Sequence, residues 1–172
     1  QLNLQSISNS VQNDYKNIEI EEFDVKNIQN LNQDIDISYK FKLTNVADVI
    51  GDQIFFEPSF IFNLKSNPFL DENRKFSVDF IYKYKESDMY AIKIPEGYEV
   101  EYLPKSIQIK MNSNNYNVKW ILSSDKDKIV LRINEEVNSS VIIADEYIDL
   151  KSAFEEFAKI QNEKIILKKI KE

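Results

Sequence analysis

The chain has 172 residues, the length of one domain with a core of its own, and its 22 basic and 29 acidic residues leave a net charge of -7. It contains no cysteine, no histidine and only two glycines, which excludes a disulfide framework, thiolate and imidazole metal sites, a Cys or His catalytic group, and glycine-rich phosphate cradles. There is no basic patch and no run near the ~20 apolar residues of a membrane span, so we expect no nucleic-acid partner, no membrane span, no metal and no cofactor.

The N-terminal third of the chain predicts strands. Residues 1–14 are polar with sparse apolar positions and predict a linker or a weak first strand. Residues 18–25 alternate with one phase slip at Glu22, which indicates a strand with a β-bulge. Residues 35–43 alternate without a fault and predict a strand with one solvated face, and residues 47–52 predict a connection that carries Gly51. Because the chain begins at Gln1 and not at Met, we expect a fragment or a processed product.

The middle of the chain is rich in turn residues. Two apolar runs, 54–56 and 60–64, flank Pro58, which should lie at a strand edge or a bend. Residues 67–69 read Asn-Pro-Phe and predict a turn, and the alternation over 76–82 predicts a further strand. Residues 90–104 hold the strongest pattern: two alternating stretches joined at Pro95-Glu96-Gly97. They predict a hairpin with a tight turn, because Pro fixes φ and Gly tolerates positive φ; Glu96 is then a solvated turn residue.

The C-terminal third adds a meander and a helix. Residues 107–111, 116–122 and 129–133 alternate and are joined by short polar loops. Apolar spacings of three and four then predict an amphipathic helix over about 145–162, with Asp145 as its N-cap, and residues 165–167 predict a short strand or an apolar tail on the sheet. Many strands with one late helix predict an all-β domain over 15–172, an Ig-like or fibronectin-like antiparallel β-sandwich with one C-terminal α-helix.

Four motifs, matched in their order along the chain, resemble a known domain. They are Asn-Pro-Phe at 67–69 followed by Val-Asp-Phe at 78–80, Ile-Pro-Glu-Gly-Tyr at 94–98 with Leu-Pro at 103–104, Ala-Asp-Glu-Tyr at 144–147, and the ending over 162–169. Residues 18–170 thereby resemble the C-terminal β-rich domain of unknown function of bacterial transglutaminase-like proteins. Ser77 and Ile81 stand where that family tends to have Pro and Gly, which affects local turn geometry. The motif residues to which we assign a structural role are Asn67, Pro68, Phe69, Arg74, Asp79, Phe80, Pro95, Gly97, Tyr98, Pro104 and Tyr147.

The resemblance implies a domain without catalysis of its own. The family's catalytic Cys, His and Asp belong to an upstream core, so no catalytic residue is carried over to this chain. We expect a non-catalytic accessory domain that packs on the transglutaminase-like core of the same protein, or that presents a surface to a partner or substrate. The resemblance also implies export to the periplasm or cell envelope of a Gram-negative bacterium.

An independent cell-surface module that binds glycan or protein is the alternative. Trp120, Tyr98, Tyr102 and Tyr116 offer an aromatic platform for a sugar, but their in-phase strand spacing favours core packing. A cluster of exposed aromatic side chains would favour glycan binding, whereas a flat exposed apolar patch would favour docking on the core.

Acidic residues leave two further interpretations open. The loop Asp125-Lys126-Asp127 is more simply a solvated turn than a calcium site, because calcium needs more oxygen ligands at fixed spacing. Asp71, Glu72 and Asp79 near Arg74 suggest either a carboxylate site or an ion pair that pins a loop, and we favour a structural pair of Asp79 with Arg74. A carboxylate-pair hydrolase needs no histidine, but no spacing in the chain predicts one.

Overall fold

The computed structural model describes residues 18–27, 32–33, 36–60 and 64–171. The chain divides into two compact units, residues 1–46 and 47–172. The predicted linker over residues 1–14 lies outside the described residues. The extent of the β-sandwich domain, 15–172, stays a prediction.

The described part of the first unit is an antiparallel hairpin of β1 (Ile18–Lys26) and β2 (Asp36–Leu43). The register shifts between Ile20 and Glu22, which confirms the predicted bulge. Ile20 pairs with Phe41, and Phe23 pairs with Tyr39, two residues earlier in β2. The extra residue in β1 therefore keeps its apolar side chains on one face, since alternate residues of a strand share a face.

The first layer of the second unit is a four-stranded antiparallel sheet. Its order is β6 (Tyr84–Lys93), β10 (Lys128–Val137), β9 (Tyr116–Ser124) and β8 (Ile107–Lys110). The last three strands confirm the predicted meander. Alternate residues of β9 and β10 are buried on one face of this sheet: Tyr116, Val118, Trp120, Leu122, Ile129, Leu131 and Ile133.

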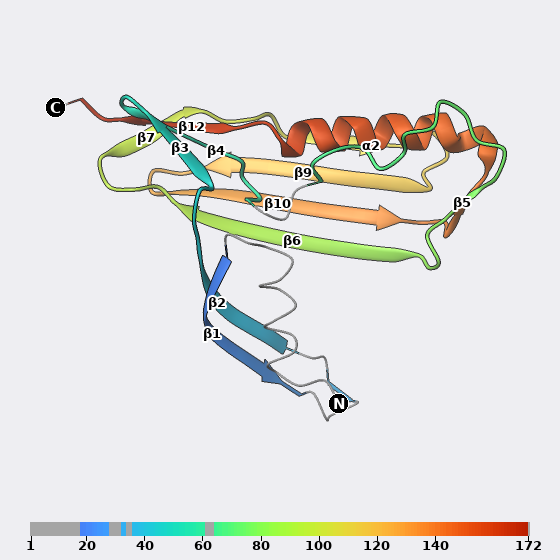
Figure 1. Ribbon diagram of the computed structural model, residues 1–172, viewed down its shortest axis with the longest axis horizontal. Helices are drawn as coiled ribbons and strands as arrows, with labels where there is room; N and C mark the ends of the chain where they lie inside the picture. Colours follow the sequence, from blue (N-terminus) through green and yellow to red (C-terminus); the bar gives the residue numbers. More distant parts are fainter. Residues whose placement is uncertain (1–17, 28–31, 34–35, 61–63, 172) are drawn as a thin grey trace. The chain divides into compact units, whose positions relative to one another are not determined.

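The second layer combines a helix with a second sheet (Figure 1). α2 (Tyr147–Gln161) follows a short 3-10 turn, η1 (Ala144–Glu146), and leads directly into β12 (Ile165–Lys169). β12 lies between β4 (Gln53–Phe56) and β7 (Tyr98–Tyr102), and β3 (Ala47–Ile50) pairs with β4 at the edge. Apolar residues of both layers share one core, which confirms an all-β, sandwich-like fold with one C-terminal helix.

The predicted hairpin at 90–104 is wrong. β6 pairs with β10 and β7 pairs with β12, so the two strands belong to different sheets. The turn between them is closed by a hydrogen bond of 3.1 Å from the Tyr98 amide to the Pro95 carbonyl, and Gly97 has a φ of 80°. Positive φ at this third position is typical of a type II turn, whose twist does not match that of a two-residue hairpin. The turn instead passes the chain from one layer to the other.

Three smaller predictions also need correction. Residues 47–52 are not a plain connection, because β3 and β4 form a hairpin around Gly51 and Asp52. The strand expected over 76–82 is reduced to β5 (Val78–Asp79), which pairs with β11 (Val141–Ile142). Asp145 does not cap the helix, since it lies inside η1, and its neighbour Glu146 precedes α2 without a side-chain cap.

Two further predictions, the place of Pro58 and the lack of a membrane span, can be compared with the structure. Pro58 is buried in the turn that directly follows β4, as its predicted place at a bend requires. Among the described residues, the structure contains no helix long and apolar enough to cross a membrane.

Candidate functional site

The Asn-Pro-Phe motif ties a loop to the helix. We call residues 64–74 the strap, because they run along α2. Asn67 is only 8% exposed; its side-chain amide donates to the Lys151 carbonyl (2.8 Å) and to the Glu155 carboxylate (3.1 Å), and its Oδ1 accepts from the Phe69 amide (3.0 Å). The turn predicted at residues 67–69 is thus confirmed. The Asn67 side chain also holds the strap on α2.

Aromatic contacts extend the strap toward the start of α2. The Phe69 ring meets the Phe154 and Tyr147 rings edge-on, with centroids 4.9 Å and 6.1 Å apart. The Tyr147 hydroxyl donates to the Asp71 carbonyl (2.9 Å), and the Arg74 guanidinium lies 5.6 Å from the centre of the Tyr147 ring. Asn67, Phe69, Arg74 and Tyr147 therefore lie together, and the exposed Pro68 lies between the first two.

The predicted ion pair of Asp79 with Arg74 is wrong. Both residues are described, and no ion pair joins them. The Asp79 carboxylate instead accepts a hydrogen bond of 2.7 Å from the Ile81 amide. Phe80, between them, stacks on Phe154 at a centroid distance of 6.4 Å. Asp79 is therefore a turn residue, in keeping with the tendency of Asp to bond the backbone two residues ahead.

That turn places Ile81 in a strained conformation. Ile81 has a φ of 69°, and the Tyr82 amide bonds the Phe80 carbonyl at 2.8 Å, which closes a three-residue γ-turn around it. γ-turns with positive φ at the centre are rare and strained, and a β-branched residue makes the strain worse. Glycine is the residue that adopts this φ without strain, so the chain forms a glycine-type turn with an isoleucine. The Ile81 side chain is 84% exposed, so packing does not repay the strain.

Ile81 belongs to a group of exposed apolar side chains at one end of the second unit. They come from the strap, from the segments around β5 and β11, and from the first turn of α2, and Figure 1 shows β5 beside the start of that helix. We call this surface the β5–β11 end; its exposed apolar residues are Leu70, Phe76, Ile81, Tyr82, Val141, Ile143 and Ile148. Exposed apolar residues gathered on one surface mark interaction sites more often than scattered ones do.

The remaining motif residues lie elsewhere in the fold. Pro95, Gly97 and Tyr98 form the turn between the layers, where the Gly97 carbonyl accepts from the Ile170 amide (2.8 Å). Pro104 is buried just after β7. These residues shape the crossing from one layer to the other.

The aromatic platform is not formed. Trp120 and Tyr116 are fully buried in the core, which confirms the preference for core packing, and Phe157 and Phe154 of α2 contact their rings. Tyr98 is half-buried. Tyr102 is exposed and its hydroxyl bonds the Glu163 carboxylate.

A carboxyl group at a core-facing position is the site that the sequence analysis missed. Glu135 of β10 lies between the buried residues Ile133 and Val137 on the core face of the first sheet. It stands directly opposite Glu86 of the neighbouring strand β6. The Tyr84 hydroxyl donates to its carboxylate (3.1 Å). The visible sign in the sequence was a charged residue in phase with an apolar alternation, Ile133, Glu135 and Val137.

The surroundings of Glu135 disfavour its charge. Burial raises the pKa of Glu135, hydrogen bonding with Tyr116 and Tyr84 opposes this in part, and the charges of Glu86 and Asp88 raise the pKa further. The buried Tyr116 hydroxyl lies beside the Glu135 carboxylate and, like the Tyr84 hydroxyl, favours its ionised form. Burial, followed by the charge of Glu135, raises the pKa of both tyrosines. Like charges on directly opposite residues destabilise a sheet, so the facing pair of Glu135 and Glu86 disfavours the pairing of β10 with β6.

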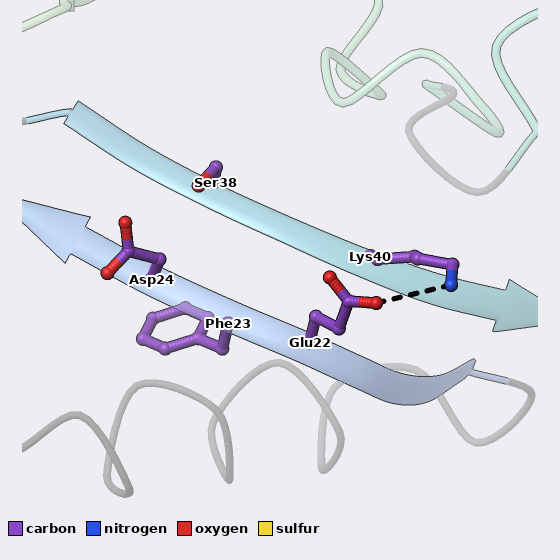
Figure 2. Close-up of a pocket in the computed structure, with 5 residues that line it drawn as sticks. All are labelled: Glu22, Phe23, Asp24, Ser38 and Lys40. Atoms are coloured by element: carbon purple, nitrogen blue, oxygen red, sulfur yellow. Dashed lines mark hydrogen bonds and ion pairs between the residues drawn. The ribbon is translucent and has the colours of Figure 1, made fainter.

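The first unit carries a polar hollow on its hairpin. Figure 2 shows this hollow, lined by Glu22, Phe23, Asp24, Ser38 and Lys40. The bulge brings two adjacent carboxylates to one ammonium, so that Lys40 Nζ lies 3.2 Å from Glu21 and 3.3 Å from Glu22, and these bonds raise the pKa of Lys40. All three side chains are exposed, and pairs of this kind contribute little to stability. The hollow is best explained as a solvated hairpin face.

Metal binding finds little support in the geometry. Asp125 accepts from the Lys126 amide in its own turn (2.7 Å), and the Asp127 carbonyl accepts from the Ile94 amide (2.9 Å). Within the described ranges, no three acidic side chains come close enough to hold a metal ion.

Comparisons with known proteins bear on the family of the chain. A family model described as a domain of unknown function with a solved structure (DUF3858) matches residues 52–167. A crystal structure of a "putative protease" from Parabacteroides distasonis ATCC 8503 resembles the chain with a TM-score of 0.49 and 17% sequence identity. The match covers 58% of this chain and 19% of that protein, so the chain spans about a fifth of its length. No curated protein matches the chain.

Proposed function

The chain belongs to the DUF3858 family of domains of unknown function, and we propose that it is a non-catalytic accessory domain at the C-terminus of a transglutaminase-like protein. In this proposal the β5–β11 end docks on the catalytic core, and the whole protein works in the periplasm or cell envelope of a Gram-negative bacterium. The four sequence motifs that resemble such domains support this assignment.

The exposed apolar surface carries the proposal. Phe76 and Ile81 expose more than four-fifths of their surface, and Tyr82 exposes 65%. Seven large apolar residues are exposed in the strap, in the segments around β5 and β11 and in the first turn of α2, and such residues favour contact with another protein surface. The strained γ-turn at Ile81 adds support, because strain of this kind persists mainly where function requires it.

A glycan-binding module is the second candidate, and it finds less support. The buried positions of Trp120 and Tyr116 remove half of the aromatic platform, and Tyr102 is bonded to Glu163. Phe76 and Tyr82 are exposed aromatic residues, but the other five exposed apolar residues of the β5–β11 end are aliphatic. This mixture suits a protein surface better than the face of a sugar.

Calorimetry between this domain and the segment encoded upstream tests the proposal. We expect the upstream core to carry Cys and His and to bind the domain. The double variant Phe76→Ser/Tyr82→Ser should weaken binding at least about tenfold, because buried aromatic side chains dominate interface energies.

A matched control separates docking from general loss of apolar surface. Val49 and Ile50 of β3 are 67% and 65% exposed and lie outside the β5–β11 end. Val49→Ser/Ile50→Ser should leave the affinity unchanged. An upstream segment without a Cys- and His-bearing core, or equal losses in both double variants, would contradict the proposal. Binding to a glycan array that is lost in Phe76→Ser/Tyr82→Ser would favour the second candidate.

A further inference from the structure

The solvent-facing side of the first sheet is basic, although the chain has a net charge of -7. Alternate residues of a strand share a face and paired residues of neighbouring strands lie side by side, so the strand registers define this side. It carries one acidic residue, Glu136, and six exposed basic residues: Lys85, Lys93, Lys110, Lys119, Lys128 and Arg132. We call this surface the basic face. Its charges come from all four strands, so a patch that no run of the sequence shows is formed by the sheet.

Most of the positive charge on the basic face is not neutralised by the chain. Lys85 pairs with Glu136 (3.2 Å), and none of the other five basic residues forms an ion pair with a described residue. Lys93 stands directly across from Lys128 in the pairing of β6 with β10. Like charges at directly opposite positions destabilise a sheet. A partner that supplies negative charge would offset this cost.

Exposed apolar residues lie in the middle of the basic face. Met89, Arg132 and Ile121 form one row across β6, β10 and β9, in which Met89 and Ile121 are 66% and 39% exposed. Lys119 lies on one side of this row, and Lys93 lies on the other. The three strand pairs keep one register throughout, so no bulge interrupts the surface. The face therefore combines an apolar centre with a basic surround.

The choice of lysine over arginine narrows the class of partner. Arginine is the preferred cation of buried ion pairs, and lysine is depleted at protein interfaces. The lysine ammonium is strongly hydrated, which suits a charged surface that it approaches without being buried. Anionic lipid headgroups form such a surface, and apolar side chains that enter the headgroup layer add to the affinity. Acidic residues on other faces oppose this contact weakly, because salt screens charges beyond roughly 10 Å.

We propose that the basic face binds the surface of a membrane that contains anionic lipids. Its basic side chains lie against the headgroups, and Met89 and Ile121 enter the headgroup layer. The contact is peripheral to the bilayer. The basic face contains no residue of the β5–β11 end, so this inference does not depend on the docking proposed there.

Co-sedimentation of the 172-residue chain with vesicles tests the proposal. One set of vesicles contains equal parts of phosphatidylglycerol and phosphatidylcholine, and the other contains phosphatidylcholine alone. We expect binding to the first set and none to the second. Binding should be lost at high salt, because the ions screen the attraction between the lysines and the headgroups.

Two charge variants with the same change in net charge locate the contact. Lys119→Gln/Arg132→Gln should weaken binding to the phosphatidylglycerol vesicles about thirtyfold, since each basic residue near an anionic membrane contributes roughly fivefold. Lys159→Gln/Lys169→Gln alters exposed positions of α2 and β12 in the second layer and should leave binding unchanged. Met89→Ser keeps the charge and should weaken binding about fivefold, because less apolar surface then leaves the water.

Three results would overturn the proposal: equal binding to both sets of vesicles, equal losses in the two charge variants, or no binding to the phosphatidylglycerol vesicles. In the last case, poly-glutamate would be tested as a soluble acidic chain. Binding of poly-glutamate that Lys119→Gln/Arg132→Gln weakens would assign the basic face to an acidic protein and not to a membrane.

Discussion

At the scale of single residues, Glu135 combines a core-facing position with a charged neighbour directly across the sheet. Its pKa is raised above the value in the unfolded chain, first by burial and then by Glu86 and Asp88. A carboxyl of this kind is disfavoured when ionised. Its contribution to stability is therefore fully present below the unfolded pKa of about 4.3 and is lost as the pH rises through the higher folded pKa.

Replacing this carboxyl should therefore stabilise the fold at neutral pH. Glu135→Gln keeps the acceptor for the Tyr84 hydroxyl and removes the charge, so its urea midpoint should exceed that of the parent protein at pH 7. The difference should shrink toward pH 4. Glu136→Gln is the control, because Lys85 lowers the pKa of Glu136 and its removal should bring no gain at pH 7. A Glu135→Gln variant less stable than the parent at pH 7 would contradict the prediction.

The positive φ of Ile81 leads to a second residue-scale prediction. Ile81→Gly should stabilise the second unit by about 1 kcal/mol, because glycine adopts this conformation without the strain of a β-branched side chain. Gly97→Ala is the reciprocal control. An added Cβ at Gly97 meets no atom within 4 Å, so a loss of about 1 kcal/mol there would report the φ of 80° alone. Both changes are measured by urea unfolding, and a destabilising Ile81→Gly would refute the strain.

At the scale of elements, the strap depends on a single amide side chain. Asn67→Ala removes three hydrogen bonds and leaves the Phe69 amide without its side-chain acceptor, so we expect a loss of about 2 kcal/mol. Amide exchange should accelerate in residues 64–74 more than in the first sheet. Ser66→Ala changes the exposed neighbour and should stay within about 0.5 kcal/mol of the parent. Equal effects of both variants would mean that Asn67 does not anchor the strap.

Elements with local patterns were predictable, and those that depend on distant partners were not. The meander and the helix follow from periodicity and short loops, which act within a few residues. β7 carries an equally clear alternation, but its partner β12 lies more than sixty residues further along the chain. Alternating strands that follow each other in the sequence usually pair. The residues of the turn at Gly97 suit a hairpin as well as a crossing between two sheets, so the sequence did not distinguish the two.

At the scale of the whole molecule, the division into two units predicts separate behaviour in fragments. Residues 47–172 hold both layers and the shared core, so this fragment should unfold in one cooperative transition. The described residues within 18–46 form a two-stranded hairpin, so a peptide of this range should show little stable structure in water. Circular dichroism and calorimetry on the two fragments check this. A fragment 47–172 that unfolds gradually would show that its core needs the first unit.

The sequence by itself determined the class of the fold, the meander, the bulge in β1, the helix and the exclusion of thiol and imidazole chemistry. Each of these depends on residue types or on periods that span a few positions. It also marked the motif residues Asn67, Phe69, Arg74 and Tyr147, but not that they meet, since the first and the last are eighty positions apart.

Only the tertiary structure decided which strands share a sheet, which apolar residues stay exposed, and that Glu135 faces Glu86 beside the buried Tyr116 hydroxyl. The physical reason is the same in each case. Burial, cross-strand pairing and the pKa of a carboxyl depend on neighbours brought together from distant parts of the chain, and a local pattern holds no record of them.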